Sequence, residues 1–227
     1  MINGNLDPFV AKVLDYHKKK SIRSYREYDE NSFHSAIEVF LNSFSISYIS
    51  ELQLIVNYNE KVNNNKADYG FVDLFIFNYS DGRDSVVFEL KLFNLIGLYS
   101  GEMNKWENHP DHKSLIEIDS KLRGESEEQL LNRNYIYWSK EEKKSKLVKV
   151  SKVINRGYEQ LNKYIKVINK GKVYNDVGIS DNRISVEPGC SFIKGYLIAS
   201  FGTQQILVKS IFKSSNFHFF NNNRNCI

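Results

Sequence analysis

Three charged residues inside two apolar stretches are the first candidates for chemistry. The segment GFVDLFIFNYSDGRDSVVFELKLF, residues 70–93, has the pattern of two strands joined by a turn, yet it carries Asp73, Glu89 and Lys91. Two carboxylates and an ammonium are costly to bury without compensation. Mg²⁺ takes one or two protein carboxylates and fills its other positions with water and phosphate oxygens. These residue types therefore predict a Mg²⁺ site, in which Mn²⁺ could substitute, with Lys91 placed to orient an attacking water or stabilise charge on a phosphate.

Whether the three charges meet depends on the turn. Side chains alternate along a strand, so Glu89 and Lys91 share a face. A three-residue turn over 80–82, with its glycine in the left-handed conformation, pairs residues whose numbers sum to 162 and sets Asp73 opposite Glu89. A two-residue turn would pair Asp73 with Leu90 and split the carboxylates between faces. We prefer the three-residue turn because it keeps the charges together.

A simpler interpretation remains open for this hairpin. Glu89 and Lys91 could be a solvent-exposed ion pair, because a D…ExK pattern arises often by chance. The flanking runs DLFIF and VVF favour burial, since strands this apolar are typical of sheets covered on both faces.

Positive charge is concentrated in one part of the chain. The 227 residues carry a formal net charge of +4, yet residues 140–172 contain eleven Lys or Arg against three Glu, a local net charge of +8. A helical segment of this charge suits a polyanionic partner, with Arg156 and Lys163 as candidate phosphate contacts. The alternative is a solvated helix face.

Hydrophobic spacing predicts the elements that position these residues. Apolar residues at helical spacing over 33–44 predict a helix, with Asn31 or Ser32 as its N-cap. A strand over 48–60 follows it and precedes the charged hairpin. A stripe spaced four, three, four, three predicts a helix over 150–168, in which Gly157 indicates close packing.

The remaining segments complete a mixed α/β pattern. Residues 100–150 lack simple periodicity and are expected to form one or two short helices and a short strand or loop. Two further strands flank Gly202. The order of helix, strand, hairpin, insertion, helix and two strands predicts a mixed central β-sheet flanked by helices.

Composition predicts an intracellular protein, cytoplasmic or nuclear, with no membrane partner. No apolar run approaches the roughly 18 residues of a membrane-spanning helix. The first twenty residues lack the long apolar region of a secretory signal. Cys190 and Cys226 are the only cysteines, and two distant thiols favour a reducing compartment.

The order of motifs resembles the PD-(D/E)xK nuclease superfamily. Asp73 matches the D of that motif, and the segment ELK, residues 89–91, matches ExK. Glu51 on the preceding strand and Glu38 on the first helix stand where members often carry an accessory acidic residue. The resemblance implies Asp73 and Glu89 as metal ligands, with Glu51 as a candidate further ligand.

The helix over 150–168 carries a second part of this resemblance. Gln160 and Tyr164 match the Q-x-x-x-Y helix of the RecB-like branch. Their i, i+4 spacing puts them on one helix face, from which they could contact the site or a nucleic-acid backbone.

A closer resemblance covers about residues 20–210. The stretches SYREYDENSFHSAIEVFL, INRGYEQLNKY and IKGYLIASFG are similar to the nuclease-like C-terminal half of predicted AAA-ATPase-like proteins of fungi and bacteria. Two features depart from that pattern. No P-loop G-x-x-x-x-G-K-[ST] occurs, and about fifty residues separate the ExK strand from the Gln160 helix.

The resemblance implies a restriction-endonuclease-like α/β core. We expect this core over 31–212, with an inserted segment at about 99–150, after a helical or connector segment at 1–30 and before an Asn-rich tail at 213–227. The expected activity is metal-dependent hydrolysis of phosphodiester bonds in DNA, with RNA as the other candidate. An inactive nuclease-fold module that binds nucleic acid or a protein partner is the alternative, and a protein-interaction domain with a merely solvated basic helix is a third.

Overall fold

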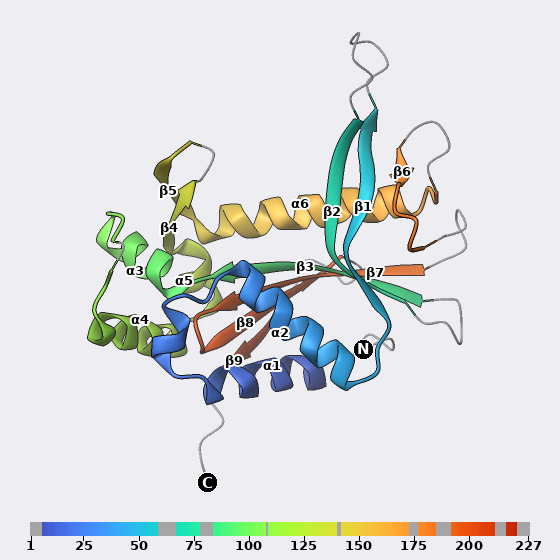
Figure 1. Ribbon diagram of the computed structural model, residues 1–227. Coiled ribbons are helices and arrows are strands. Elements are labelled where there is room, and N and C mark those ends of the chain that lie inside the picture. The colour runs from blue at the N-terminus through green and yellow to red at the C-terminus, as the bar shows by residue number, and fades with distance from the viewer. Residues whose placement is uncertain are drawn as a thin grey trace.

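A mixed β-sheet with helices on both faces forms the centre of the molecule (Figure 1). The computed structural model describes residues 6–58, 67–77, 84–107, 109–139, 142–172, 177–184, 192–211 and 217–221. The helices are α1 (Asp7–Lys19), α2 (Glu30–Ser43), α3 (Leu95–Met103), α4 (His112–Gly124), α5 (Glu127–Asn132) and α6 (Val150–Ile168), with a 3₁₀ turn, η1 (Ile22–Tyr25). The strands are β1 (Tyr48–Tyr58), β2 (Ala67–Ile76), β3 (Asp84–Phe93), β4 (Asn134–Ser139), β5 (Lys144–Lys149), β6 (Gly178–Ile179), β7 (Phe192–Phe201), β8 (Gln205–Ser210) and β9 (Phe217–Asn221).

The central sheet mixes parallel and antiparallel neighbours. Within the described ranges it has seven strands in the order β6-β1-β2-β3-β7-β8-β9. β3 and β7 are parallel, whereas the other neighbours are antiparallel. β4 and β5 form a separate antiparallel pair. The prediction of a mixed α/β sheet flanked by helices is therefore confirmed.

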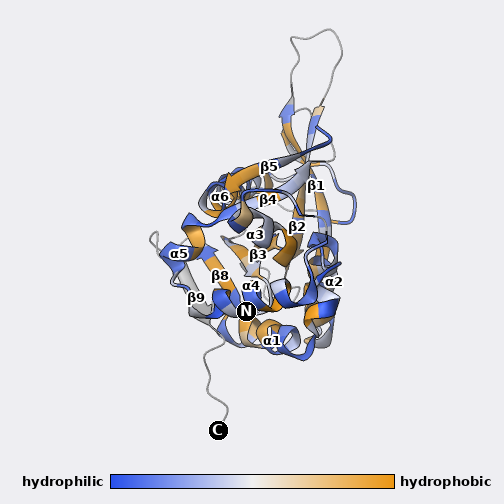
Figure 2. Cartoon of the chain, turned by 90° about the vertical axis from the view of Figure 1, so that its left-hand side faces the viewer, coloured by the Kyte–Doolittle hydropathy of each residue, from blue (hydrophilic) through white to orange (hydrophobic). Residues whose placement is uncertain are grey.

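Helices cover the two faces of β3 and β7. The ring of Phe9 in α1 lies 5.7 Å from the ring of Phe88, which in turn contacts Tyr196 on the same face. On the other face α6 approaches so closely that a Cβ at Gly157 would lie 2.6 Å from Cδ1 of Leu197. Figure 2 shows the helices around the sheet and β1 with β2 extending beyond them as an arm. This packing makes the centre of β3 a buried position on both sides.

The two long predicted helices form, with one correction. α6 spans the predicted 150–168, and α2 includes most of the predicted 33–44. Neither Asn31 nor Ser32 is the N-cap of α2. Asp29 takes that position, because its carboxylate accepts a 2.8 Å hydrogen bond from the amide of Ser32. The helix therefore starts earlier, at Glu30.

The basic segment 140–172 is not one helix. Lys144–Lys149 is strand β5, which pairs with β4, and the helix begins only at Val150. Pairing decides this, because Leu147 lies opposite Ile136 across the ladder. The segment itself carries no apolar stripe at helical spacing before residue 150.

The region between β3 and α6 packs as a layer at one end of the sheet (Figure 1). It begins at Leu95, before the expected position 99, and contains α3, α4, α5, β4 and β5. Asp119 of α4 accepts hydrogen bonds from the amide and hydroxyl of Thr203, at 2.8 and 2.6 Å. These bonds tie the region to the turn between β7 and β8, where Gly202 has φ +50°. The turn 80–82 lies outside the described residues, and so do residues 213–216 and 222–227 of the expected tail.

Candidate active site

The three charged residues of the hairpin meet where β2 and β3 separate. The two strands pair through Leu74 with Phe88 and two further pairs toward the turn, and all three pairs sum to 162. This is the predicted register, and its continuation sets Asp73 opposite Glu89. Beyond Leu74 the strands no longer pair, so the edge of β3 from Glu89 onward is left open to side chains.

Asp73 occupies the opening between the strands. Its Oδ2 accepts a 2.6 Å hydrogen bond from the backbone amide of Leu90, which satisfies a strand donor that β2 leaves unpaired. The same oxygen lies 3.6 Å from Nε2 of His34 on α2. The side chain of Asp73 remains 18% exposed. One carboxylate is thus fixed against the backbone of the ExK strand.

Glu89 and Lys91 form a buried ion pair beside it. Oε1 of Glu89 lies 2.8 Å from Nζ of Lys91, and the Glu89 side chain is 1% exposed. Within the described residues neither oxygen of Glu89 has a hydrogen bond of good geometry, so the Lys91 contact is short but poorly aligned. Lys91 also reaches Oε1 of Glu30 at 3.5 Å. Among the described residues Oε2 of Glu89 therefore has no partner, whereas Oε1 is held by the Lys91 ammonium.

Burial and like charge shift the acidities of this cluster. Burial, and next the charge of Asp73, raise the pKa of Glu89 to about 7 despite the opposing effect of Lys91. Burial likewise raises the pKa of Asp73, although Lys91 and the Leu90 amide act against it. Burial by itself lowers the pKa of Lys91, but Glu89, Glu30 and Asp73 together raise it above its usual value. The ammonium therefore stays charged between carboxylates that resist ionisation.

Helix α6 closes the site through three residues at helical spacing. A Cβ at Gly157 would lie 3.4 Å from Cε of Lys91 and 3.7 Å from Cγ of Glu89. One turn later Gln160 donates a 3.2 Å hydrogen bond to the hydroxyl of Tyr164. Burial and the charge of Glu89 raise the pKa of Tyr164. The Q-x-x-x-Y pair therefore lies on the face of α6 that meets the carboxylates, and the close packing predicted at Gly157 is present.

Sequence reasoning missed two members of the cluster, both on α2. Glu30 contacts Lys91, and His34 contacts Asp73. With the half-buried Glu38 they occupy successive turns of one helix face, at i, i+4 and i+8. The positions of His34 and Glu30, four and eight residues before Glu38, could have indicated that all three share a helix face. Only the packing of α2 reveals which residues that face meets.

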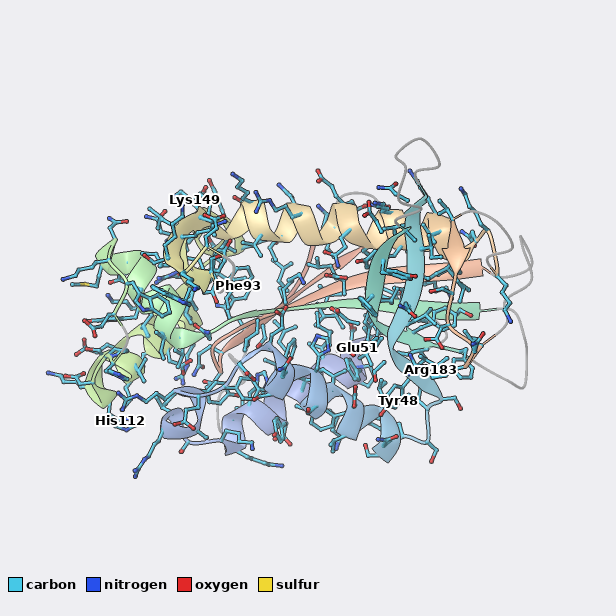
Figure 3. The ribbon with its side chains drawn as sticks, turned by 45° about the horizontal axis from the view of Figure 1, so that its top comes forward. Tyr48, Glu51, Phe93, His112, Lys149 and Arg183 are labelled. Carbon is cyan, nitrogen blue, oxygen red and sulfur yellow. The ribbon has the colours of Figure 1, made fainter. Side chains whose placement is uncertain are left out.

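Glu51 lies in an unusual backbone conformation. Its φ is +51°, in the left-handed region that a non-glycine residue seldom adopts. It falls between the ladder pairs of Ser50 and Leu52, and its carbonyl accepts a 3.2 Å hydrogen bond from Arg183 (Figure 3). Its side chain is exposed. The structure thus places Glu51 beside Arg183, and its role as a metal ligand stays a prediction.

A cationic stripe runs along α6 next to the Gln160 face. At about 100° per residue, Lys152, Arg156 and Lys163 lie within about 40° of arc, with Gln160 between them and the Gly157 face. All three are exposed. Lys149 (Figure 3), Lys152 and Arg156 also line a surface groove of about 630 Å³ together with residues 147–148 of β5. Arg156 and Lys163 thus lie on one exposed face of α6, and their role as phosphate contacts stays a prediction.

The cluster fits a cation that needs few protein ligands. Among the described residues no three His, Cys, Asp or Glu side chains converge as a metal site. Asp73 and Glu89 supply two carboxylates, the number that Mg²⁺ commonly takes from a protein. Burial and the charge of Asp73 outweigh the effect of Lys91 on the pKa of Glu89, so that carboxylate is only partly compensated, as a metal ligand is before the ion binds.

Comparisons with known proteins found no relatives. No protein-family model matches the chain, and neither a curated protein nor a solved structure does. In the part of the chain that the structure describes, no helix is long and apolar enough to cross a membrane.

Proposed function

We propose that the chain is a metal-dependent nuclease of the PD-(D/E)xK type, with a restriction-endonuclease-like core, that hydrolyses phosphodiester bonds of DNA. One observation carries the proposal: the carboxylate of Glu89 is fully buried and finds no aligned hydrogen bond among the described residues, although it lies beside Asp73 and Lys91, where β2 and β3 separate. A purely structural ion pair buried this deeply would be expected to satisfy its remaining lone pairs with donors.

The residues divide the work of hydrolysis between them. Asp73 and Glu89 would hold Mg²⁺, or Mn²⁺ in its place, and the ion when bound lowers the pKa of a water and neutralises charge on the phosphate. Lys91, kept protonated by its three carboxylate neighbours, orients a water and stabilises the charge that develops on the phosphate oxygens. His34 lies close enough to Asp73 to orient that carboxylate or to add a nitrogen donor.

Substrate positioning falls to helix α6. Gln160 is tied to Tyr164 and faces the carboxylates, so its amide can contact the backbone near the scissile phosphate. The stripe of Lys152, Arg156 and Lys163 extends from that point along the helix and would bind the neighbouring phosphates.

A second function is supported by a different observation. Lys91 already pairs with Glu89 and Glu30, and Asp73 already accepts from the Leu90 amide, so the cluster compensates much of its own charge. A nuclease-fold module that binds nucleic acid or a protein without turnover would keep such an arrangement. It differs from the enzyme in that the chain would bind but never cleave.

Nicking of supercoiled plasmid distinguishes the metal-dependent nuclease from the binding module. The wild type is incubated with Mg²⁺ or Mn²⁺, with EDTA as the metal-free control, and RNA is tested in parallel. Asp73→Asn keeps an oxygen that accepts from the Leu90 amide but removes the charge, and Lys91→Met keeps the aliphatic length of the side chain. We expect each to lower the rate by about 10²- to 10⁴-fold, the usual contribution of a positioned catalytic group.

The control is Asp15→Asn, which removes an exposed carboxylate of α1 that pairs with Lys19. It should cleave at the wild-type rate. Equal cleavage by the wild type, Asp73→Asn and Lys91→Met would show that a contaminant cuts the plasmid. Binding of DNA without metal-dependent nicking would favour the inactive module.

A further inference from the structure

Two exposed aromatic side chains share a strand with the candidate catalytic aspartate. Tyr69 is 55% exposed and Phe71 is 49% exposed, whereas Gly70 and Val72 between and after them are buried. Alternation along β2 therefore puts Tyr69, Phe71 and Asp73 on one side of the strand. We call Tyr69 and Phe71 the aromatic track, and it leads along the β1–β2 arm directly to the cluster.

The strand beneath this track is held from behind. A Cβ at Gly70 would lie 2.7 Å from Cε1 of Tyr164 and 2.9 Å from Cγ1 of Val56, so the ring of Tyr164 is seated against the backbone between the two aromatic residues. Tyr164 belongs to the helix that closes the candidate site. The same helix thus packs against the strand of the track and against Glu89 and Lys91.

The spacing of the track suits an extended polymer. Residues two apart on a strand are about 7 Å apart, twice the roughly 3.4 Å that separates successive stacked bases within one strand of a duplex. Phe71 and Tyr69 would therefore meet successive bases only in a strand that is pulled out and unpaired. Gln53, directly opposite Phe71 on β1 and half-buried, adds an amide that can pair with a base edge.

Positive charge is available on the neighbouring helix. The exposed Lys163 is the chain neighbour of Tyr164, so the cationic stripe belongs to the helix that packs against the other side of β2 from the aromatic rings. Aromatic faces for bases together with cations for phosphates are the combination by which proteins hold single strands.

We propose that the aromatic track is a stacking platform for single-stranded nucleic acid, which it delivers to the Asp73–Glu89 cluster. This inference rests on the proposed function and names its substrate class: a single strand, or a single-stranded end next to a duplex. Phe71 stacks on the base nearest the scissile phosphate, and Tyr69 stacks on the next base along the arm.

Equilibrium binding in EDTA tests the track without any cleavage. Fluorescently labelled single-stranded DNA, the same sequence as a duplex, and a matched RNA strand are titrated with wild type and variants. We expect Phe71→Ala to raise the Kd for the single strands by about 5- to 100-fold and the Kd for the duplex by less than about twofold. Tyr69→Ala should act in the same direction.

The matched control is Phe44→Ala. Phe44 is 47% exposed, close to the exposure of Phe71, but it is the C-cap of α2 and precedes Tyr48, which pairs with Ile76 at the far end of β2 from Tyr69. It should leave every Kd unchanged. Phe71→Trp should restore single-strand affinity, and its added indole fluorescence should be quenched on binding because the base stacks on it.

Three outcomes would overturn the inference: unchanged affinity in Phe71→Ala, an equal loss for duplex and single strand, or no quenching in Phe71→Trp. The last result would favour a protein partner on this face. Because EDTA blocks metal-dependent cleavage, failure of the track and failure of the nuclease proposal are observed separately. Single-strand binding without nicking would retain the track and remove the catalytic role.

Discussion

The buried carboxylate of Glu89 should make the protein less stable as pH rises. Its pKa is about 7 in the folded state against an ordinary value of 4.5, mainly because burial disfavours the charged form. Between these two values the folded chain binds more protons than the unfolded chain. The free energy of unfolding therefore falls as pH rises through this window and levels off above it.

The expected loss of unfolding free energy follows from the shift in the pKa of Glu89. Each pKa unit corresponds to about 1.4 kcal/mol, so a change from 4.5 to about 7 implies a loss of about 3 kcal/mol attributable to Glu89. Glu89→Gln is nearly isosteric and cannot ionise. The unfolding free energy of Glu89→Gln minus that of the wild type should therefore rise by about 3 kcal/mol between pH 4.5 and about 8.

Urea denaturation followed by circular dichroism measures this difference across the pH range, with EDTA present throughout. A second variant tests whether the pH-dependent loss of stability is due to Glu89. In Lys91→Met the nearest cation that lowers the pKa of Glu89 is lost. The folded-state pKa of Glu89 should then rise further, so the decline in stability should still begin near pH 4.5 but continue to higher pH, and adding Glu89→Gln should again remove it.

A flat difference between Glu89→Gln and wild type over this window would refute the reasoning. It would mean that Glu89 is ionised at its ordinary pKa, and hence that water or another donor satisfies it. The buried, only partly compensated carboxylate on which the metal site depends would then not exist.

Two further predictions concern packing and a second buried titratable group. Gly157→Ala should lower the free energy of unfolding by about 1–3 kcal/mol in urea denaturation, because its Cβ would overlap Leu197, whereas Gly124→Ala on α4, where nothing lies within 4 Å, should not destabilise the protein. His17 is fully buried, and neither ring nitrogen has a hydrogen-bond partner in the part of the chain that the structure describes; burial and then the charge of Lys20 lower its pKa to about 4 from 6.5. Stability attributable to His17 should thus be present above pH 6.5 and fall by about 3 kcal/mol as pH drops through 4, and His17→Phe should abolish that fall in the same assay.

Local pattern was enough to predict most elements of this protein. Apolar residues recur at helical spacing throughout α6, so the span of this helix over 150–168 could be predicted directly from the sequence. The register of β2 with β3 was also predictable, because turn chemistry and side-chain alternation are short-range constraints. The charges at Asp73, Glu89 and Lys91 could be assigned to one place for the same reason.

Tertiary structure alone decided the environment of those charges. Sequence offers no signal that β2 leaves β3 after Leu74 or that Asp73 then accepts from the Leu90 amide, and the helical spacing of Glu30 and His34 does not reveal which residues they meet. Strand β5 was missed because its pairing with β4 outweighs weak local propensity. These contacts join residues far apart in the chain, and their free energy comes from packing and desolvation that no local spacing encodes.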